Sequence, residues 1–230
     1  MQDADGSSYP LYIEMVGPSG VGKTTIAKLI AEALYPRPVF FRGGLRKRQL
    51  RNFVNTLWSR WRLKYFFWFY RYLRVEKRVP RAPAARRAAA ITGIPACPSF
   101  ARVRDGVLLV EEGPLMYFTG CGGYGPHWEE WVRILLPDDR RVRSFFVVLR
   151  ASPEEIRKRR NMRGRIRKRR SWPKGTEGMT DDLQEQARCY WLPRLSKEGA
   201  YCIEIGTDDR SASEVAQEIV GHIRLRSRRR

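Results

Sequence analysis

The chain is organised around residues 17–24, which read Gly17-Pro18-Ser19-Gly20-Val21-Gly22-Lys23-Thr24. This stretch matches every position of the pattern G-x-x-x-x-G-K-[ST], which is typical of a phosphate-binding loop, or P-loop. The apolar run 11–16 before it predicts a buried strand, and the apolar spacing within 25–34 after it predicts a helix with one buried face. A strand, a glycine-rich turn and a helix start are the surroundings that the motif needs, so we expect a nucleotide site here.

The residues of this loop have expected roles in binding ATP and Mg²⁺. The glycines let main-chain N–H groups approach a phosphate closely, and the start of the following helix attracts anions. We expect Lys23 to reach the β- and γ-phosphates and the Thr24 hydroxyl to bind Mg²⁺. The nucleotide-binding residues expected in this stretch are Gly17, Ser19, Gly20, Val21, Gly22, Lys23, Thr24 and Thr25.

Length and composition favour one α/β domain over residues 1–230. The chain is 43% hydrophobic, which is enough for a full core, and it has no run of about 18 apolar residues that would span a membrane. Residues 1–8 are polar and acidic, so we expect a disordered tail and not a signal peptide. The four cysteines have no C-x-x-C spacing, and a reducing cytoplasmic location fits them.

The net charge of +21 is high and partly local. Residues 157–170 hold ten Lys/Arg and no acid, and we interpret 157–180 as a basic lid and 226–230 as a disordered basic tail. Such a chain attracts polyanions whether or not they are its substrate. Non-specific attraction to polyanions and a peripheral position at an anionic membrane therefore stay open, while no specific nucleic acid is predicted.

Strands and helices alternate along the chain, which predicts a parallel sheet covered by helices on both faces. We expect the ligand to lie at the carboxyl ends of the strands. The predicted strands are 11–16, 38–41, 107–110, 144–149 and 200–205.

An aromatic-rich segment, 58–75, lies within a helical region predicted over 45–93. Wound as a helix, it places six aromatic residues on one face: Trp58, Trp61, Tyr65, Trp68, Phe69 and Tyr72. Four basic residues fall roughly opposite, with Phe67 as the misfit among them: Arg60, Lys64, Arg71 and Arg74. The aromatic face is expected to pack on the core or on a second subunit in a homodimer, to form a wall of the acceptor site, or to touch lipid.

Several stretches together resemble one family. The P-loop is one, and Phe41-Arg42-Gly43-Gly44 is similar to the Arg-Glu-Pro-Gly-Gly stretch after the second strand of thymidylate kinases. Residues 152–155, Ser-Pro-Glu-Glu, lead into arginines as at the start of that family's lid, and 206–208, Gly-Thr-Asp, ends the last strand before a helix. From 11 to 223 the chain resembles the thymidylate-kinase-like branch of P-loop nucleoside and nucleotide kinases. The resemblance implies a three-layer α/β fold with a parallel five-stranded sheet in the order 2-3-1-4-5.

The resemblance implies roles for residues outside the P-loop. Arg42 would bind an acidic group of the acceptor, and Thr207 and Asp208 would lie beside the adenine. Arg159 and Arg163 would act as lid arginines that neutralise the transferring phosphoryl group. Because these two arginines are four positions apart on a helix, they are expected to share a face.

Two adjacent carboxylates, Glu111 and Glu112, follow the third predicted strand. Thymidylate kinases have Asp-Arg-aromatic at this place, and there the arginine helps to hold the substrate phosphate. A second carboxylate instead suits a hydroxyl that must lose a proton, or Mg²⁺. We assign Glu111 to Mg²⁺ and Glu112 to the catalytic base, although the roles can be exchanged because adjacent side chains on a strand point to opposite faces.

The sequence thus predicts an Mg²⁺-dependent kinase that transfers the γ-phosphate of ATP to a small-molecule acceptor. The acceptor stays open among nucleosides, nucleotides, sugars and glycolipid-like hydroxyls. One alternative is a kinase acting on nucleic-acid ends, which the net charge favours. Another is a regulatory protein that binds nucleotide without being a kinase, although the chain has no Asn-Lys-x-Asp motif for guanine.

Overall fold

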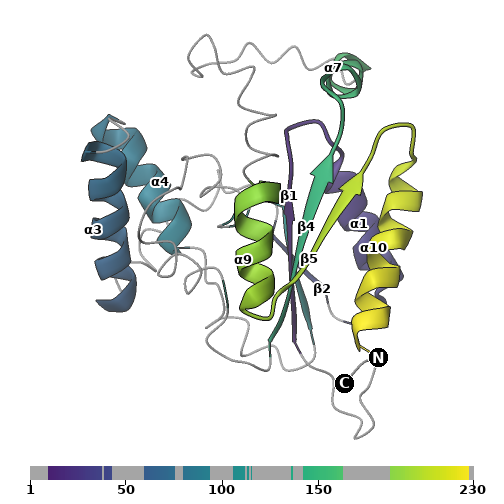
Figure 1. Cartoon of the computed structure of the whole chain (residues 1–230), viewed down its shortest axis with the longest axis horizontal. Coiled ribbons are helices and arrows are strands. Elements are labelled where there is room, and N and C mark those ends of the chain that lie inside the picture. Colours follow the sequence, from purple (N-terminus) through teal and green to yellow (C-terminus); the bar gives the residue numbers. More distant parts are fainter. Residues whose placement is uncertain are drawn as a thin grey trace, which may run out of the picture.

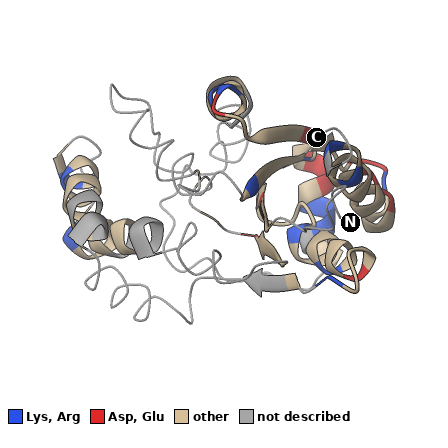
Figure 2. Cartoon of the chain, turned by 90° about the horizontal axis from the view of Figure 1, so that it is seen from below, with Lys and Arg blue, Asp and Glu red and all other residues tan. Residues whose placement is uncertain are grey.

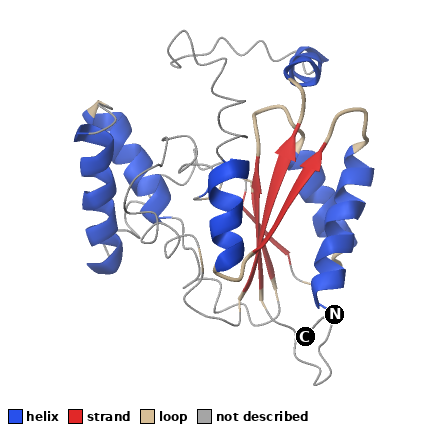
Figure 3. Cartoon of the chain, viewed as in Figure 1, coloured by secondary structure: helices blue, strands red, loops and turns tan. Residues whose placement is uncertain are grey.

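The structure is a computed structural model, and it describes residues 10–37, 39–42, 60–75, 80–93, 106–111, 113, 115, 136, 142–162 and 187–227. These residues form one five-stranded sheet with helices on both faces (Figures 1 and 3). The strands are β1 (Leu11–Val16), β2 (Val39–Arg42), β3 (Val107–Val110), β4 (Arg143–Arg150) and β5 (Tyr201–Gly206).

The strand order is β2-β3-β1-β4-β5, and every neighbouring pair is parallel. This order and the five parallel strands are as the sequence predicts. Leu11 of β1 is in register with Val107 of β3 on one side and with Arg143 of β4 on the other. Because β1 has a strand on each side and helices over both faces, all six of its residues are buried.

One face of the sheet is covered by α1 (Lys23–Ala33) and α10 (Ala212–Ser227), which lie side by side in Figure 1. Alternate strand residues such as Ile13 and Val147 point to this side and pack with Ile26 and Ile219 of the two helices. The predicted disordered tail at 226–230 is wrong at its start, since α10 continues to Ser227.

On the opposite face, α9 (Leu192–Lys197) lies next to the sheet, while the helical pair α3 (Arg60–Val75) and α4 (Arg81–Gly93) lies farther out on the same side (Figure 1). Its core contains Tyr12 of β1, Leu73 of α3 and the fully buried Trp191 just before α9. The last described helix, α7 (Pro153–Met162), follows β4 at the carboxyl edge of the sheet (Figure 1).

The aromatic segment has one buried side, as predicted, but not with all of the predicted members. Phe69 and Tyr72 are buried and Trp68 packs against the same core, while the aliphatic Leu73, which the aromatic pattern missed, is also fully buried. Phe67, the misfit, is 61% exposed. The predicted positions 58 and 59 and the side chains of Trp61 and Tyr65 lie outside the described residues.

Residues Thr180-Asp181-Asp182 predict the start of a helix that runs to about 195, and its described part, from Ala187 on, is helical. Residues Ala187–Trp191 form a π-helical turn, and the α-helix α9 begins at Leu192. Pro193 explains the change, because a proline has no N–H for the usual bond four residues back and its ring crowds that carbonyl. Arg194 Nη1 donates to the Tyr190 carbonyl at 2.8 Å within this turn.

Several predicted segments lie outside the described residues: 1–8, 43–59, most of the lid at 163–180, and 228–230. Among the helices that the structure does describe, none has the length and apolar content needed to cross a membrane.

Candidate active site

The P-loop follows β1 at the carboxyl edge of the sheet and packs tightly on its neighbour. A Cβ atom on Gly17 would lie 2.6 Å from the main-chain oxygen of Leu149 in β4, so no other residue fits without moving the backbone. Gly20 and Gly22 both have φ near 103°, in the left-handed region that favours glycine. The loop conformation therefore requires glycine at the positions where the motif has it.

The first turn of α1 is suited to an anion. Gly22 precedes the helix without a side-chain cap, and the first turn contains no acidic residue. A helix start carries a partial positive charge and main-chain N–H groups that need an acceptor. This region can therefore hold a phosphate, as the sequence predicts.

Lys23 brings a positive charge to the same loop. Its Nζ donates to the carbonyl of Gly17 at 2.6 Å and to that of Pro18 at 3.0 Å, and the residue is only 8% exposed. The ammonium group is thus held across the loop by the loop's own backbone, close to the start of α1.

A side-chain contact links the loop after β1 to the end of the neighbouring strand β3. Thr24 lies in the first turn of α1, and Glu111 directly follows β3. The Thr24 hydroxyl donates to Glu111 Oε2 at 2.7 Å, and Glu111 is 7% exposed. A hydroxyl and a carboxylate at this distance match the oxygen ligands that Mg²⁺ prefers. The two residues predicted to share the metal role are therefore brought together.

Two further predicted residues are only partly described. Arg42 ends β2 in register with Val110, so its backbone lies beside the strand that leads to Glu111, but its side chain is outside the described residues. Glu112 and Arg163 are outside them entirely.

Arg159 on α7 lies between the P-loop and the turn after β5. Its Nη1 donates to the carbonyl of Val21 at 3.3 Å and to Thr207 Oγ1 at 3.0 Å, and its Nη2 donates to the Thr207 carbonyl. Its Nε donates to Glu155 Oε1 at 2.7 Å within the helix. Four hydrogen bonds thus hold the guanidinium as a brace, a position that the sequence did not predict for a lid arginine.

Thr207 and Asp208 fix the turn after β5 to the end of β4. Thr207 is buried, and its main-chain N–H and its hydroxyl both donate to the Arg150 carbonyl. The Asp208 carboxylate accepts the N–H of Ser152 at 2.9 Å. This turn therefore lies next to the P-loop, joined to it through Arg159.

The spacing of Ser152 and Glu155 predicts a reciprocal capping box at the start of α7, and the structure forms only half of it. Ser152 Oγ accepts the N–H of Glu155 at 3.2 Å, as expected for an N-cap. The reciprocal bond to the Ser152 N–H comes from Asp208, while Glu155 pairs with Arg159. The reciprocal pair does form at the start of α10, between Ser211 and Glu214, where it lowers the pKa of Glu214.

Glu14 is a buried carboxylate that the sequence reasoning missed. It lies in the middle of β1 on the α9 side and accepts the Tyr12 hydroxyl at 2.6 Å. A Cβ atom on Gly113 would lie 2.3 Å from Glu14 Cδ, so the turn after Glu111 rests on this carboxylate. The signal was present as one acidic residue within the apolar run 11–16, because an acid is rarely buried without a role.

The chain belongs to a family whose model is described as an AAA domain and matches residues 13–184. The structure is similar to deoxyadenosine kinase from M. mycoides with dCMP and dCDP bound. The TM-score is 0.52 with 13% identity, and the alignment covers 93% of this chain and 99% of that one. The dATP-bound form of that kinase gives a TM-score of 0.50, with 11% identity over 93% and 99% of the chains.

Shikimate kinase from Acinetobacter baumannii, bound to shikimate, aligns with 97% of this chain and 96% of its own, with 18% identity and a TM-score of 0.46. A search of curated proteins found no match. At these identities the solved structures establish the fold, and the activity has to be argued from the site.

Proposed function

We propose that the protein is an Mg²⁺-dependent kinase that transfers the γ-phosphate of ATP to a hydroxyl of a small molecule. The observation that carries this proposal is the joint between Thr24 and Glu111, at 2.7 Å, beside a P-loop whose Lys23 is already held in place. A protein that only bound phosphate would not need a buried carboxylate on the neighbouring strand. Binding of Mg²⁺ to this pair would neutralise charge on the transferring group.

The chain's own residues supply positioning and charge. Lys23 and the N–H groups at the start of α1 would hold the phosphates, and Glu111 would orient the Thr24 hydroxyl. Glu112 is proposed as the base that accepts the proton of the acceptor hydroxyl, and Arg42 as a contact for an acidic group on the acceptor. Thr207 and Asp208 would border the adenine, and Arg159 and Arg163 would serve the lid.

The acceptor is proposed to lie on the side of the sheet that carries α3 and α4. Both helices follow β2 in the chain, and β2 ends beside the strand that leads to Glu111. Two adjacent carboxylates there suit a neutral hydroxyl better than a nucleoside monophosphate. We therefore place the enzyme in the thymidylate-kinase-like branch with an acceptor other than thymidylate.

The experiment is an ADP-release assay with ATP, Mg²⁺ and a panel of acceptors. The panel contains nucleosides, nucleoside monophosphates, sugars, a glycolipid and an oligonucleotide with a free 5′-hydroxyl. We expect one small-molecule class to raise ADP release at least ten-fold above the rate without acceptor, and phosphorylated product to appear by mass spectrometry. Omission of Mg²⁺ is the control.

Stimulation by the oligonucleotide alone would replace this proposal with a kinase acting on nucleic-acid ends. Tight ATP binding without phosphoryl transfer to any member of the panel would instead favour a regulatory protein that binds nucleotide without being a kinase.

A further inference from the structure

The helical pair α3 and α4 differs in charge from the rest of the described fold. Residues 60–93 contain ten Lys/Arg and one acidic residue. Figure 2 shows basic but no acidic positions on these two helices, whereas the helices at the other end of the molecule carry both signs. The net positive charge of the protein is therefore concentrated on a flank of the fold as well as in the lid.

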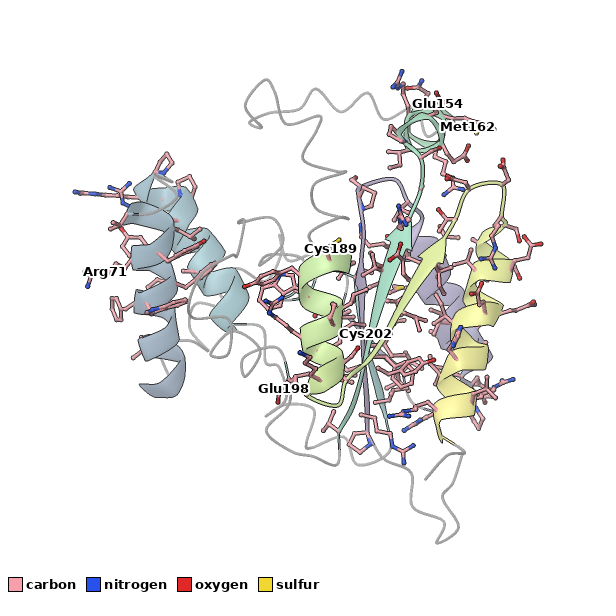
Figure 4. All side chains as sticks on the ribbon, viewed as in Figure 1. Arg71, Glu154, Met162, Cys189, Glu198 and Cys202 are labelled. Carbon is pink, nitrogen blue, oxygen red and sulfur yellow. The ribbon has the colours of Figure 1, made fainter. Side chains whose placement is uncertain are left out.

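The outer side of α3 combines this charge with exposed apolar side chains. Phe67 is 61% exposed and Val75 is 67% exposed, and Arg71 lies between them in the sequence. In Figure 4 the Arg71 side chain points away from the rest of the chain. Phe67 is held by an edge-on contact with Phe66, with ring centroids 5.4 Å apart.

The inner side of α3 is already used. Phe69 and Leu73 are buried in the same core as Ala84 and Ala88 of α4. Within the described part of the chain, Phe67 and Val75 on the outer side belong to neither core cluster and stay exposed. Phe67 lies among the basic residues of this helix. Its exposed position is explained if the outer side contacts a partner that is apolar and also carries negative charge.

We infer that the outer face of α3, formed by Phe67, Arg71, Arg74 and Val75, docks on an anionic lipid surface. Arginines near such a surface are attracted by its negative potential, while a phenylalanine and a valine can enter the boundary between headgroups and acyl chains. A nucleic acid would use the charge but offers a weaker partner for the aliphatic Val75. Figure 1 places α3 on the flank of the molecule, apart from the P-loop at the end of β1.

The test is co-sedimentation of the full chain with vesicles of phosphatidylcholine that contain about 30% phosphatidylserine, an anionic lipid. We expect binding that weakens as salt is raised, and no binding to phosphatidylcholine alone. Neutralising one arginine is expected to weaken partitioning about five-fold, and removing the aromatic side chain weakens it further. The double variant Phe67→Ser, Arg71→Gln should lose on the order of twenty-fold.

The matched control is Met162→Ser, Arg157→Gln on α7. This pair removes the same charge and an apolar side chain that is 73% exposed, from a helix leading into the basic lid (Figure 4). We expect the control to keep partitioning within about two-fold of the unaltered protein, because surface changes away from the contact have small effects. Equal thermal melting temperatures of all variants show that they fold. If the double variant does not fold, the single variant Phe67→Ser is used in its place.

Four results would overturn the inference, of which the last concerns binding of an oligonucleotide. The first is no binding to anionic vesicles at low salt, and the second is an equal loss in the α3 and α7 variants. The third is dimerisation, seen by light scattering without vesicles and abolished by Phe67→Ser, since a second copy would then cover this face. If an oligonucleotide binds and loses affinity in the α3 variant as strongly as vesicles do, the face is a general polyanion surface and the lipid assignment is wrong.

Discussion

Glu111 Oε2 accepts the Thr24 hydroxyl at 2.7 Å, and this contact joins the P-loop to the neighbouring strand. The sequence predicts both residues, because the motif specifies Thr24 and the end of a buried strand specifies Glu111. What the sequence does not settle is whether Glu111 or Glu112 faces the loop. The structure settles the position of Glu111, since its carboxylate reaches Thr24, and Glu112 stays a prediction.

Replacement of Glu111 by Gln keeps an oxygen for Thr24 but removes the negative charge. We expect the Mg²⁺ concentration for half-maximal rate to rise about 10- to 100-fold, with partial rescue at high Mg²⁺. Glu112→Gln should instead lower the rate without metal rescue and with little change in ATP affinity. Metal titrations of both variants separate these roles, and full activity in both would remove the acidic pair from the mechanism.

Glu14 shows why a buried polar residue is hard to assign from a sequence. Its neighbours along β1 are apolar, so the strand itself is predicted correctly. The pattern assigns no function to the single acidic residue within it. Only the fold brings Gly113, about a hundred positions later, against its carboxylate. Glu14 is therefore placed to hold the turn that follows Glu111, through packing and not through contact with substrate.

This packing predicts that Gly113→Ala costs about 1–3 kcal/mol of unfolding free energy, because the added methyl group overlaps the Glu14 carboxylate. Gly221→Ala in α10 is the matched control, since an added Cβ there meets no atom within 4 Å, and alanine should stabilise the helix by up to about 1 kcal/mol. Urea unfolding measures both.

The double variant Gly113→Ala, Glu14→Ala should be less destabilised than the sum of the single variants, by about 0.5–3 kcal/mol. Strict additivity would show that the two residues do not press on each other.

At the scale of elements, the sequence predicts best where a residue pattern has a sharp end. The bounds of β1 and β3 are as predicted, because each is an apolar run that stops at a turn signal. The helix predicted from 180 to about 195 is helical from Ala187 on, but its π-helical turn at Ala187–Trp191 was not predicted; it lies just before Pro193, whose missing N–H interrupts the regular ladder. Proline chemistry within the pattern was the available signal.

The element with the most informative contacts is α7. Arg159 ties this helix to Val21 of the P-loop and to Thr207, while its contact with the phosphates stays a prediction. Long-range contacts of this kind depend on how β4 and β5 lie side by side, which no local pattern specifies. In this position Arg159 would stabilise the nucleotide site by holding its parts in register.

We therefore expect Arg159→Ala to lower the unfolding free energy by about 1–3 kcal/mol and to raise the KM for ATP, because hydrogen bonds from a charged group to Thr207 and Val21 are lost. Lys158→Ala, which removes an exposed partner of Glu155, should change stability by less than about 0.5 kcal/mol. Thermal melts and ATP titrations compare the two. A drop in kcat with unchanged stability and KM would instead favour direct contact with the phosphoryl group.

At the scale of the whole molecule, the alternation of strands and helices was enough to predict a parallel sheet, and the family resemblance supplied the order of its five strands. Charge was less informative, because net charge says nothing about where basic residues gather in space. The fold adds that α3 and α4 form a basic flank separate from the P-loop. The acceptor is proposed to lie on this side, where the core joins residues far apart in sequence, such as Tyr12, Leu73 and Trp191.

The most direct test of the central claim is the rate of ADP release by Lys23→Ala with the acceptor that the panel identifies. Loss of one preorganised charge of this kind typically lowers the rate by about 10²–10³-fold. Lys28→Ala is the control, since Lys28 is an exposed lysine on the same helix. We predict the large loss for Lys23→Ala with an unchanged circular dichroism spectrum and normal activity for Lys28→Ala. Near-normal phosphoryl transfer by folded Lys23→Ala protein would contradict the assignment of this P-loop to ATP-dependent catalysis.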